Sequence, residues 1–371
     1  MTRLVLLGGG HAQLAVLASL AERPMAGCDV QLVTPYRRQI YSGMLPGWVA
    51  GHYPIEACAI ALDALAARGG VAFHQAAAVA VDAPSQLLRC DDGAELHFDL
   101  LSIDTGPVAA IADLPGSVQN ALPIRPIEGF VAAWPKLVER VRGAGRRFDL
   151  VILGAGAAGV ELAFAIRHRA VTDGWSHLRL TLVGSDTLPL EGSPEKLRRQ
   201  VTALLARRRI GWVGGRKAER IEPNRIHLEH GEAIDFDGCL VVTGAAAPAW
   251  PRAAGMATDD RGFIGVGPTL QSRSHPQIFA AGDIAAYSDA RPKSGVFAVR
   301  AGPTLAHNLR AKCEGRSLEA WHPQQRALYL ISTGDRHALA SWGRWAWNGS
   351  WVWHWKDRID RQFVRRFGGS A

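Results

Sequence analysis

The chain contains two glycine-rich turns, and each follows a short apolar run and precedes an alanine- and leucine-rich stretch. The first turn occupies residues 8–10 after the run at 4–7, and the second occupies residues 154–156 after the run at 150–153. This order predicts a strand–turn–helix unit, which holds a dinucleotide pyrophosphate against the helix N-terminus. Two such units predict two dinucleotides. Two nucleotide cofactors have little reason to share one chain unless electrons pass between them.

The second turn is the more regular, because Gly154, Gly156 and Gly159 fill all three positions of a GxGxxG pattern. The first glycine permits the tight turn, the second lets a pyrophosphate approach the backbone, and the third lets helix and strand pack closely. The competing interpretation is an ordinary strand-to-helix connection that binds no ligand.

The first turn departs from the pattern. Gly8 and Gly10 match, but Gln13 stands where the third glycine is expected, so the helix should pack less closely on its strand. The following strand ends at Thr34, where an acidic residue normally binds a ribose hydroxyl. Thr34 can still hydrogen-bond a ribose, but the carboxylate is missing. The first turn is therefore identified mainly by the rest of the chain.

Composition indicates a large globular protein. The 371 residues fit two domains and a small third piece, and a chain that is 48% hydrophobic and 20% charged can build a large core. The net charge of +8 suits anionic nucleotides or a membrane surface. Nothing in the chain resembles a nucleic-acid-binding module, so no nucleic-acid partner is expected.

The five cysteines are scattered, and no two form a CxxC pair or a zinc-ligand spacing, so we expect no metal site. Such cysteines are typical of core residues in a reducing compartment. The first strand begins by Leu4, which leaves no room for a signal peptide, and no apolar stretch approaches the ~20 residues that span a bilayer. We expect a cytoplasmic protein, with peripheral attachment to the inner face of the membrane as the alternative.

A third motif connects the two turns. Residues 278–285 end an apolar strand in Gly282-Asp283, and two other strands end in Thr-Gly at residues 105–106 and 243–244. As a set, these motifs resemble the pyridine nucleotide-disulfide oxidoreductases, flavoproteins that bind two dinucleotides, over residues 1 to about 312. The resemblance implies FAD at the first turn, NAD(P)H at the second, and contact of Asp283 with the flavin ribityl chain.

Four further segments resemble a type II NADH dehydrogenase-like subgroup of that family. They are residues 41–47, 292–303, 332–336 and 355–361, which extend the match over nearly the whole chain. Members of this subgroup are also found fused to, or near, selenophosphate synthase. A functional link to selenium metabolism stays open at this point.

The expected fold class is α/β, with two Rossmann-like three-layer domains and a small C-terminal hairpin–helix region. The FAD-binding domain is expected to be discontinuous, at residues 1–110 and 263–320, around an NAD(P)H-binding domain at 111–262, and the C-terminal region spans 321–371. The expected cofactor-binding residues are Gly8, Gly10, His11, Ala12, Thr34, Pro46, Thr105, Gly106, Gly154, Gly156, Gly159, Glu161, Thr243, Gly244, Gly282, Asp283, Lys293, Gly295 and Val296.

Two residues are candidates for a catalytic role. Lys293 stands at a helix start, where the helix N-terminus and the ammonium would stabilise an anionic reduced flavin. The alternative is a solvent-facing lysine in a turn. The resemblance places Glu161 near the nicotinamide, and the alternative is a solvated glutamate favoured by the helix dipole.

The expected function is an FAD-dependent NAD(P)H dehydrogenase that passes electrons to a second acceptor, with a quinone favoured by the resemblance. Hydride transfer needs proximity and orientation rather than a side-chain acid or base. The absence of a cysteine pair excludes disulfide reduction. Two alternatives are a flavoenzyme that oxidises a small sulfur or selenium substrate and a non-catalytic flavin redox sensor or partner subunit. NADH and NADPH are not distinguished, because Gly184 replaces the glutamate that favours NADH and no arginine follows immediately.

The C-terminal region is rich in tryptophan. Trp345, Trp347, Trp351 and Trp353 alternate around Asn348-Gly349, which predicts a β-hairpin followed by a helix with an apolar stripe and several arginines. Aromatic and basic residues together suit a membrane interface. The alternative is a hairpin and helix packed on the FAD domain or on the partner of a homodimer.

Overall fold

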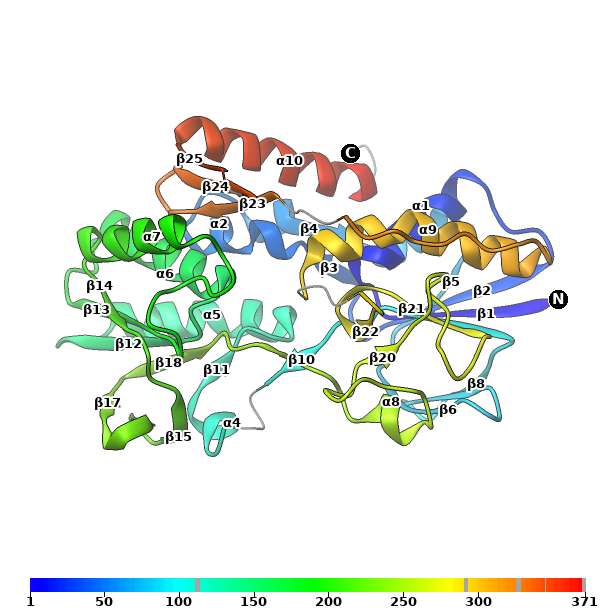
Figure 1. The fold of residues 1–371 in the computed structure, drawn as a ribbon, viewed down its shortest axis with the longest axis horizontal. Coiled ribbons are helices and arrows are strands. Elements are labelled where there is room, and N and C mark those ends of the chain that lie inside the picture. The colour runs from blue at the N-terminus through cyan, green and yellow to red at the C-terminus, as the bar shows by residue number, and fades with distance from the viewer. Residues whose placement is uncertain (111–113, 290–292, 325–327, 344, 369–371) are drawn as a thin grey trace.

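The computed structural model describes residues 1–110, 114–289, 293–324, 328–343 and 345–368. Two parallel five-stranded sheets form two halves that lie side by side, and the C-terminal helix α10 runs across the top of the molecule (Figure 1). This arrangement confirms the expected α/β class with two Rossmann-like units.

The first sheet has the strand order β21-β9-β1-β2-β5, with all neighbours parallel. Its fifth strand comes from far along the chain, so the first unit is discontinuous, as expected. The strands are β1 (Thr2–Leu7), β2 (Cys28–Val33), β5 (Ala72–His74), β9 (Leu100–Ile103) and β21 (Ile278–Ala280).

Both faces of this sheet are covered, which is why its strands are almost wholly apolar. Leu4 and Leu6 of β1 pack with three helices on one face, whereas Val5 and Leu7 pack with a three-stranded antiparallel sheet on the other. The covering elements are α1 (His11–Glu22), α3 (Leu62–Arg68) and α9 (Gly295–Cys313), and β6 (Ala78–Asp82), β7 (Leu87–Cys90) and β8 (Glu95–His97).

The second sheet repeats this layering with the order β11-β18-β12-β13-β14, again parallel. Its strands are β11 (Leu122–Pro123), β12 (Phe148–Leu153), β13 (Leu178–Val183), β14 (Ile210–Val213) and β18 (Gly238–Val241). Its covering elements are α5 (Ile127–Arg142), α6 (Ala157–Thr172) and α7 (Glu195–Arg207), and β15 (Ala218–Glu222), β16 (Arg225–Leu228) and β17 (Ala233–Asp235).

The chain crosses between the halves at an antiparallel pair of two-residue strands, β10 (Val108–Ala109) and β19 (Ala245–Ala246). The expected domain boundary at 110 follows β10 directly, whereas the expected boundary at 262 lies 16 residues after β19, and Ala254 and Met256 already pack in the core of the first half. The remaining short elements are β3 (Arg38–Ile40), α2 (Leu45–Val49), β4 (Ala59–Ala61), α4 (Ser117–Asn120), α8 (Trp250–Ala253), β20 (Ile264–Gly265) and β22 (Ala285–Ala286).

The C-terminal region corrects one expectation. The hairpin consists of β24 (Ala338–Trp342) and β25 (Trp345–Gly349), next to β23 (Leu328–Ser332), so Asn348-Gly349 ends a strand and is not the turn. Helix α10 (Ser350–Gly368) starts directly afterwards and contains Trp351, Trp353 and Trp355. The alternating tryptophans had suggested a strand through residue 353. In the structure the consecutive residues Val352 and Trp353 are both buried, which does not fit the alternation of a half-exposed strand.

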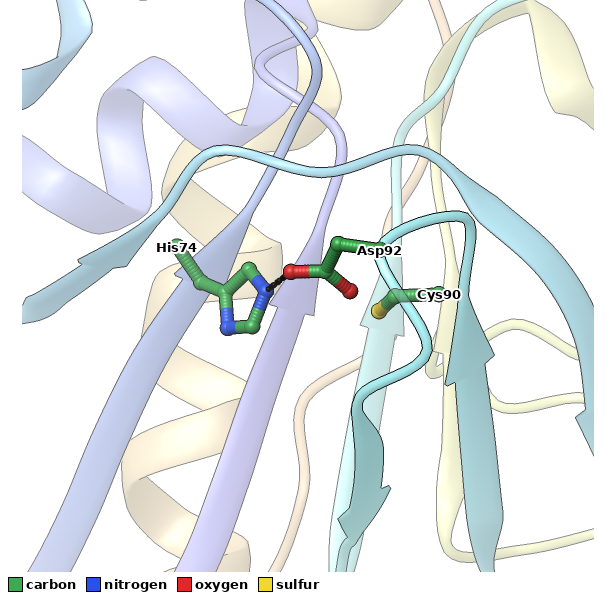
Figure 2. A group of neighbouring side chains, drawn as sticks. All are labelled: His74, Cys90 and Asp92. Atoms are coloured by element: carbon green, nitrogen blue, oxygen red, sulfur yellow. Dashed lines mark hydrogen bonds and ion pairs between the residues drawn. The ribbon is translucent and has the colours of Figure 1, made fainter.

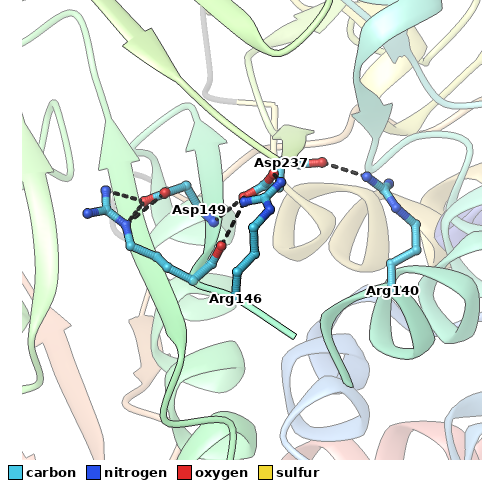
Figure 3. Close-up of polar contacts among 5 residues, drawn as sticks. Arg140, Arg146, Asp149 and Asp237 are labelled. Carbon is cyan, nitrogen blue, oxygen red and sulfur yellow. Dashed lines mark hydrogen bonds and ion pairs between the residues drawn. The ribbon is translucent and has the colours of Figure 1, made fainter. Parts of the chain in front are cut away.

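An ion-pair network closes the N-terminal edge of the second sheet (Figure 3). Arg146 contacts the Asp237 carboxylate at 2.6 Å, the backbone N–H of Asp149 donates to the same carboxylate, and Arg140 donates to the Asp237 carbonyl. A cavity of ≈ 520 Å³ lies beside this network. Ligands of doubly wound sheets bind at the opposite, carboxyl edge, where the glycine turns lie. The network therefore serves the fold rather than the candidate site.

Candidate active site

The first glycine turn packs directly on the chain that leaves β9. Gly8 has φ +94°, and a Cβ on it would lie 2.5 Å from the carbonyl oxygen of Asp104 and 2.7 Å from Cα of Thr105. A Cβ on Gly10 would lie 2.2 Å from Cγ of Asp104. Neither position has room for a side chain, so the turn can lie at the carboxyl edge of the sheet only with glycine at both.

Asp104 was not among the expected site residues, yet it lies at the centre of this turn. Its Oδ2 accepts hydrogen bonds from the backbone N–H groups of Ala12 (2.8 Å) and Gln13 (3.0 Å), in the first turn of α1. Burial raises the pKa of Asp104 to about 7, and the nearby Asp283 adds to the shift. The only signal in the sequence was an acidic residue directly after a buried strand.

Gln13 explains how α1 tolerates the loss of the third glycine. Its amide nitrogen donates to the Ser102 carbonyl at 3.0 Å, and the Ser102 hydroxyl donates to its amide oxygen at 3.0 Å. Both residues are fully buried, and this pairing spares the amide the cost of an unpaired buried polar group. The helix is thus joined to β9 by side-chain hydrogen bonds at this position.

The other expected flavin-side residues gather around Asp104. A Cβ on Gly282 would lie 2.4 Å from Asp104 Oδ1, and Asp283 follows directly, with Arg125 at 3.8 Å. Gly106, after Thr105, has φ +72°. Thr34 is placed at the same edge, because Gly8 donates to the carbonyl of the residue that precedes Thr34.

His11 shows an unfilled polar requirement between two helix starts. Its Nε2 is buried and has no hydrogen-bond partner among the described residues. The same atom lies 3.8 Å from where a Cβ on Gly295, the first residue of α9, would be. Burial lowers the pKa of His11 to about 4, and Arg125 adds to this shift, so the ring is neutral at pH 7. A polar group of a bound FAD fits this position, with Ala12 and Val296 in the same helix starts.

Lys293 and Pro46 differ in their surroundings. The Lys293 ammonium donates to the Ala285 carbonyl at 2.6 Å and lies 3.8 Å from the centre of the Phe263 ring. Burial lowers its pKa to about 8. Lys293 is therefore a partly buried residue rather than a solvent-facing one in a turn. Pro46 is buried in α2, which packs against α6 of the other half.

The second turn has the same backbone geometry with more space. Gly154 has φ +112°, and its Cβ would lie 2.5 Å from the Val242 carbonyl oxygen, whereas a Cβ on Gly159 would lie 1.8 Å from the Gly154 carbonyl oxygen. Nothing lies within 4 Å of a Cβ on Gly156. The Thr243 hydroxyl, next to Gly244, is buried without a partner among the described residues. An open glycine and an unpaired hydroxyl at a helix N-terminus fit a nucleotide pyrophosphate.

The position that normally carries the ribose-binding acid is filled by neighbours. A Cβ on Gly184 would lie 2.7 Å from the Trp212 ring and 2.8 Å from Cβ of Ala155. A glutamate therefore does not fit here unless Trp212 moves. Arg216 lies beside this position, because its backbone N–H donates to the Gly184 carbonyl at 3.2 Å. The sequence did not indicate this neighbour, because Arg216 follows the next strand of the sheet.

Glu161 belongs to a buried charge network rather than to a solvated helix turn. Its Oε1 accepts the Ser332 N–H at 2.8 Å. The Lys356 ammonium donates to the Gly43 carbonyl and to Asp360, each at 2.6 Å. Burial raises the pKa of Glu161 to about 7, although Lys356 and the Ser332 N–H oppose the shift. The carboxyl group is thus poised to exchange a proton near neutral pH.

Helix α10 connects this network to the first turn. The Phe363 ring stacks on Tyr41 with 4.4 Å between centroids, and His11 meets Tyr41 edge-on at 5.5 Å. The Tyr41 hydroxyl also hydrogen-bonds Asp360. In the sequence, residues 41–47 matched the subgroup and Pro46 was expected to bind a cofactor, but contact of this segment with α10 was not predicted.

The cysteines offer no activated thiol near either turn among the described residues. Cys58 is buried in the core beside α2, and burial raises the pKa of its thiol to about 12. Cys28 and Cys313 are in hydrogen-bonding contact, far apart in sequence, and burial together with Cys28 raises the pKa of Cys313 to about 12. A reactive cysteine needs a lowered pKa.

The sequence is similar to those of known proteins. The sequence family described as pyridine nucleotide-disulphide oxidoreductase matches residues 2–308. Demethylphylloquinone reductase of Synechocystis is 28% identical over 331 residues, covering 85% of this chain and 81% of that protein. An NADH dehydrogenase-like protein of Mycobacterium tuberculosis is 26% identical over 301 residues, covering 77% and 73%.

Two solved structures have the same fold. NDH2 of Plasmodium falciparum in complex with NADH has a TM-score of 0.84 at 11% identity, covering 98% of this chain and 97% of that chain. The sulfide:quinone oxidoreductase of Aquifex aeolicus has a TM-score of 0.81 at 19% identity, covering 99% and 92%.

We predict that Asp104→Asn changes how stability depends on pH. The folded state raises the pKa from 3.8 to about 7, so the native protein binds more protons than the unfolded chain in that window, and stability falls as pH rises through about 7. Asparagine still accepts the two helix N–H bonds but does not titrate. Thermal unfolding between about pH 5 and about pH 8 should therefore show a smaller loss of Tm in the variant than in the parent.

The matched control is Asp63→Asn, at a carboxylate that is 31% exposed and contacts Arg37. It should keep the parent pH dependence. Parallel Tm curves for the parent and Asp104→Asn would show that Asp104 is ionised throughout.

Proposed function

Because the chain belongs to the pyridine nucleotide-disulphide oxidoreductase family, in its type II NADH dehydrogenase-like group, we propose that it transfers electrons from NAD(P)H through FAD to a quinone. The observation that carries this proposal is the pair of glycine turns at the carboxyl edges of two parallel sheets. Each turn is accompanied by a buried side-chain atom without a hydrogen-bond partner in the described part of the chain, His11 Nε2 in one half and the Thr243 hydroxyl in the other.

FAD, when bound, would supply the redox chemistry that couples hydride donation by NAD(P)H to reduction of the acceptor. The chain would contribute binding and orientation. We propose that the first turn and Asp283 hold the flavin nucleotide, and that Gly154, Gly156 and Gly159 hold NAD(P)H. Lys293, a partly buried cation before α9, would place positive charge near the flavin.

A quinone acceptor would need one proton more than NAD(P)H supplies. Reduction of a quinone to a quinol takes two electrons and two protons, while NAD(P)H supplies two electrons and one proton. The second proton must come from the protein or from solvent. Glu161 fits this role, because its pKa of about 7 leaves it partly protonated at neutral pH and Lys356 stabilises the anion that remains.

The relatives agree with a quinone, since one is named a demethylphylloquinone reductase and another an alternative NAD(P)H-ubiquinone oxidoreductase. Oxidation of a small sulfur or selenium compound is less well supported, because Cys58 and Cys313 have raised rather than lowered pKa values. A role as a redox sensor would not need the open space at Gly156.

We propose that both NADH and NADPH are accepted. No carboxylate fits at Gly184 to select NADH or to repel a 2′-phosphate, and Arg216 lies beside that position. The Arg216 guanidinium is paired with Glu232 at 3.0 Å, which limits how strongly it would favour NADPH.

We also propose that the C-terminal region rests on an anionic lipid surface. The exposed apolar surface of β24, β25 and α10 is formed by five tryptophans and one isoleucine: Trp342, Trp345, Trp347, Trp351, Trp355 and Ile359. Arg358, Arg365 and Arg366 are exposed on the same helix. Exposed tryptophans beside arginines suit the headgroup region of a bilayer. Within the described residues, no helix combines the length and apolar character needed to cross a membrane.

We predict that Gly156→Val abolishes reduction by NAD(P)H while FAD stays bound. A valine side chain would fill the open space at the second turn, where the pyrophosphate would approach. Anaerobic titration of the yellow protein should show bleaching at 450 nm, roughly the flavin maximum, in the parent only. Gly145→Val, at another open glycine outside both turns, is the control.

Loss of FAD from Gly156→Val, with binding of NAD(P)H retained, would show that the two turns are assigned in the wrong order. Failure of the parent to bleach with either nucleotide would exclude the dehydrogenase.

We predict that Glu161→Gln slows quinone reduction but not flavin reduction. In the parent, the rate with a soluble quinone should fall as pH rises through about 7, because Glu161 loses its proton. The variant should lack this limb and be slower at low pH by about 10²-fold or more. Stopped-flow measurement separates the two half-reactions.

Glu139→Gln, at an exposed glutamate of α5, should behave like the parent. If Glu161→Gln instead slows bleaching by NAD(P)H, Glu161 orients the nicotinamide and the proton must come from elsewhere.

We predict that Trp345→Ser with Trp351→Ser weakens binding to vesicles that contain anionic lipid. These side chains are 67% and 54% exposed, so their removal should cost little stability while it removes apolar contact with lipid. Co-sedimentation measures the bound fraction. Val171→Ser, at a residue that is 73% exposed on α6, should leave binding unchanged. Equal sedimentation of the double variant and the parent would refute this orientation.

A further inference from the structure

Three side chains that can ligate a metal meet at the edge of the first half, away from the network around Glu161. Figure 2 shows His74 at the end of β5 facing Asp92 and Cys90, which come from β7 and the turn after it. One ligand atom from each residue lies within 4.8 Å of the other two. The cluster lies at one end of the space between the parallel sheet and the β6–β7–β8 sheet.

Two of the three groups are held in place by hydrogen bonds. His74 Nε2 lies 2.7 Å from Asp92 Oδ2, and Gln31 approaches His74 Nδ1 at 3.2 Å. The other carboxylate oxygen of Asp92 accepts the Ala94 N–H at 3.0 Å. The imidazole and the carboxylate therefore face each other before any ion arrives. A metal at His74 Nε2 would leave the ring proton on Nδ1, and the Gln31 amide would then turn its oxygen toward Nδ1 to accept it, as outer partners do in known sites.

Cys90 supplies the third group from the protected side of the cluster. The residue is only 4% exposed, and Figure 2 shows its sulfur directed toward the Asp92 carboxylate. A divalent cation at this point would bind both the thiolate and the carboxylate and offset their negative charges.

We propose that His74, Cys90 and Asp92 form a zinc-binding site. Imidazole, thiolate and carboxylate are all zinc ligands, and a soft sulfur together with a nitrogen selects Zn²⁺ over Mg²⁺ or Ca²⁺. Zinc–ligand distances of about 2.0–2.3 Å place tetrahedral ligand atoms about 3.3–3.6 Å apart. The three ligand atoms lie within 4.8 Å of one another, so side chains must move by about 1 Å to reach these separations. Asp92 can move in this way, because its side chain is exposed. The fourth position would hold water.

The site would join elements that lie beside the expected ribose position. The His74 carbonyl accepts the N–H of Thr34, the residue after β2. An ion held by His74 and Cys90 would tie the edge strand β5 to β7 of the neighbouring sheet. We therefore expect bound zinc to raise the Tm. This inference is independent of the proposed electron acceptor.

Cobalt provides a direct test on the FAD-loaded protein. After removal of metal with a chelator, one equivalent of Co²⁺ should produce the red-region bands of tetrahedral cobalt with a thiolate ligand, where oxidised flavin does not absorb. Zn²⁺ should abolish these bands stoichiometrically and raise the Tm. Cys90→Ser and His74→Ala should each weaken binding by more than the about 10- to 100-fold typical of a change in an outer partner.

Cys239→Ser is the matched control, because Cys239 is also 4% exposed but lies in β18 of the other half. It should bind Co²⁺ like the parent. Asp92→Asn keeps the shape of the ligand and tests the site if His74→Ala unfolds. Failure of the parent to give the cobalt bands, or equal bands in Cys90→Ser and the parent, would overturn the proposal.

Discussion

One backbone contact is repeated in both halves, and the candidate site depends on it. The first glycine of each turn lies so close to the chain leaving a neighbouring strand that a Cβ would stand 2.5 Å from a carbonyl oxygen, that of Asp104 in one half and Val242 in the other. This contact sets each helix N-terminus at the carboxyl edge of its sheet. It therefore places one anion-binding helix end at the carboxyl edge of each sheet.

The two halves satisfy that constraint with different chemistry around it. The second turn keeps three glycines and an open space, which suits an exchangeable nucleotide. In the first, Gln13 and Asp104 replace a third glycine with a buried hydrogen-bonded group that joins α1 to β9. Burying these polar groups costs desolvation free energy. Because the groups are hydrogen-bonded to one another, the network holds the start of α1 rigidly. A tightly held flavin is consistent with that rigidity.

Helix α10 and the cluster of His74, Cys90 and Asp92 show how distant parts of the chain come together. Helix α10 brings Lys356 and Asp360 next to Glu161, almost 200 residues earlier, and places Phe363 on Tyr41. Burial raises the pKa of Glu161 to about 7, and Lys356 opposes that shift while Asp360 adds to it. At the other end, β5 and β7 bring His74 beside Cys90, although no zinc spacing exists in the sequence.

The sequence alone determined the α/β class and the two strand–turn–helix units, because local apolar runs and glycine patterns depend on near neighbours. The discontinuous first half was implied by the family resemblance. The segment with Gly154, Gly156 and Gly159 forms the connection between β12 and α6, with Gly159 in the first turn of that helix. The tertiary structure decided what surrounds those turns. Asp104, Lys356 and Trp212 act through contacts between segments far apart in the chain, and burial rather than residue type shifts the pKa values of Glu161 and Asp104. The hairpin turn was misplaced for the same reason, since alternating tryptophans fit a strand until the packing of α10 buries Val352 and Trp353.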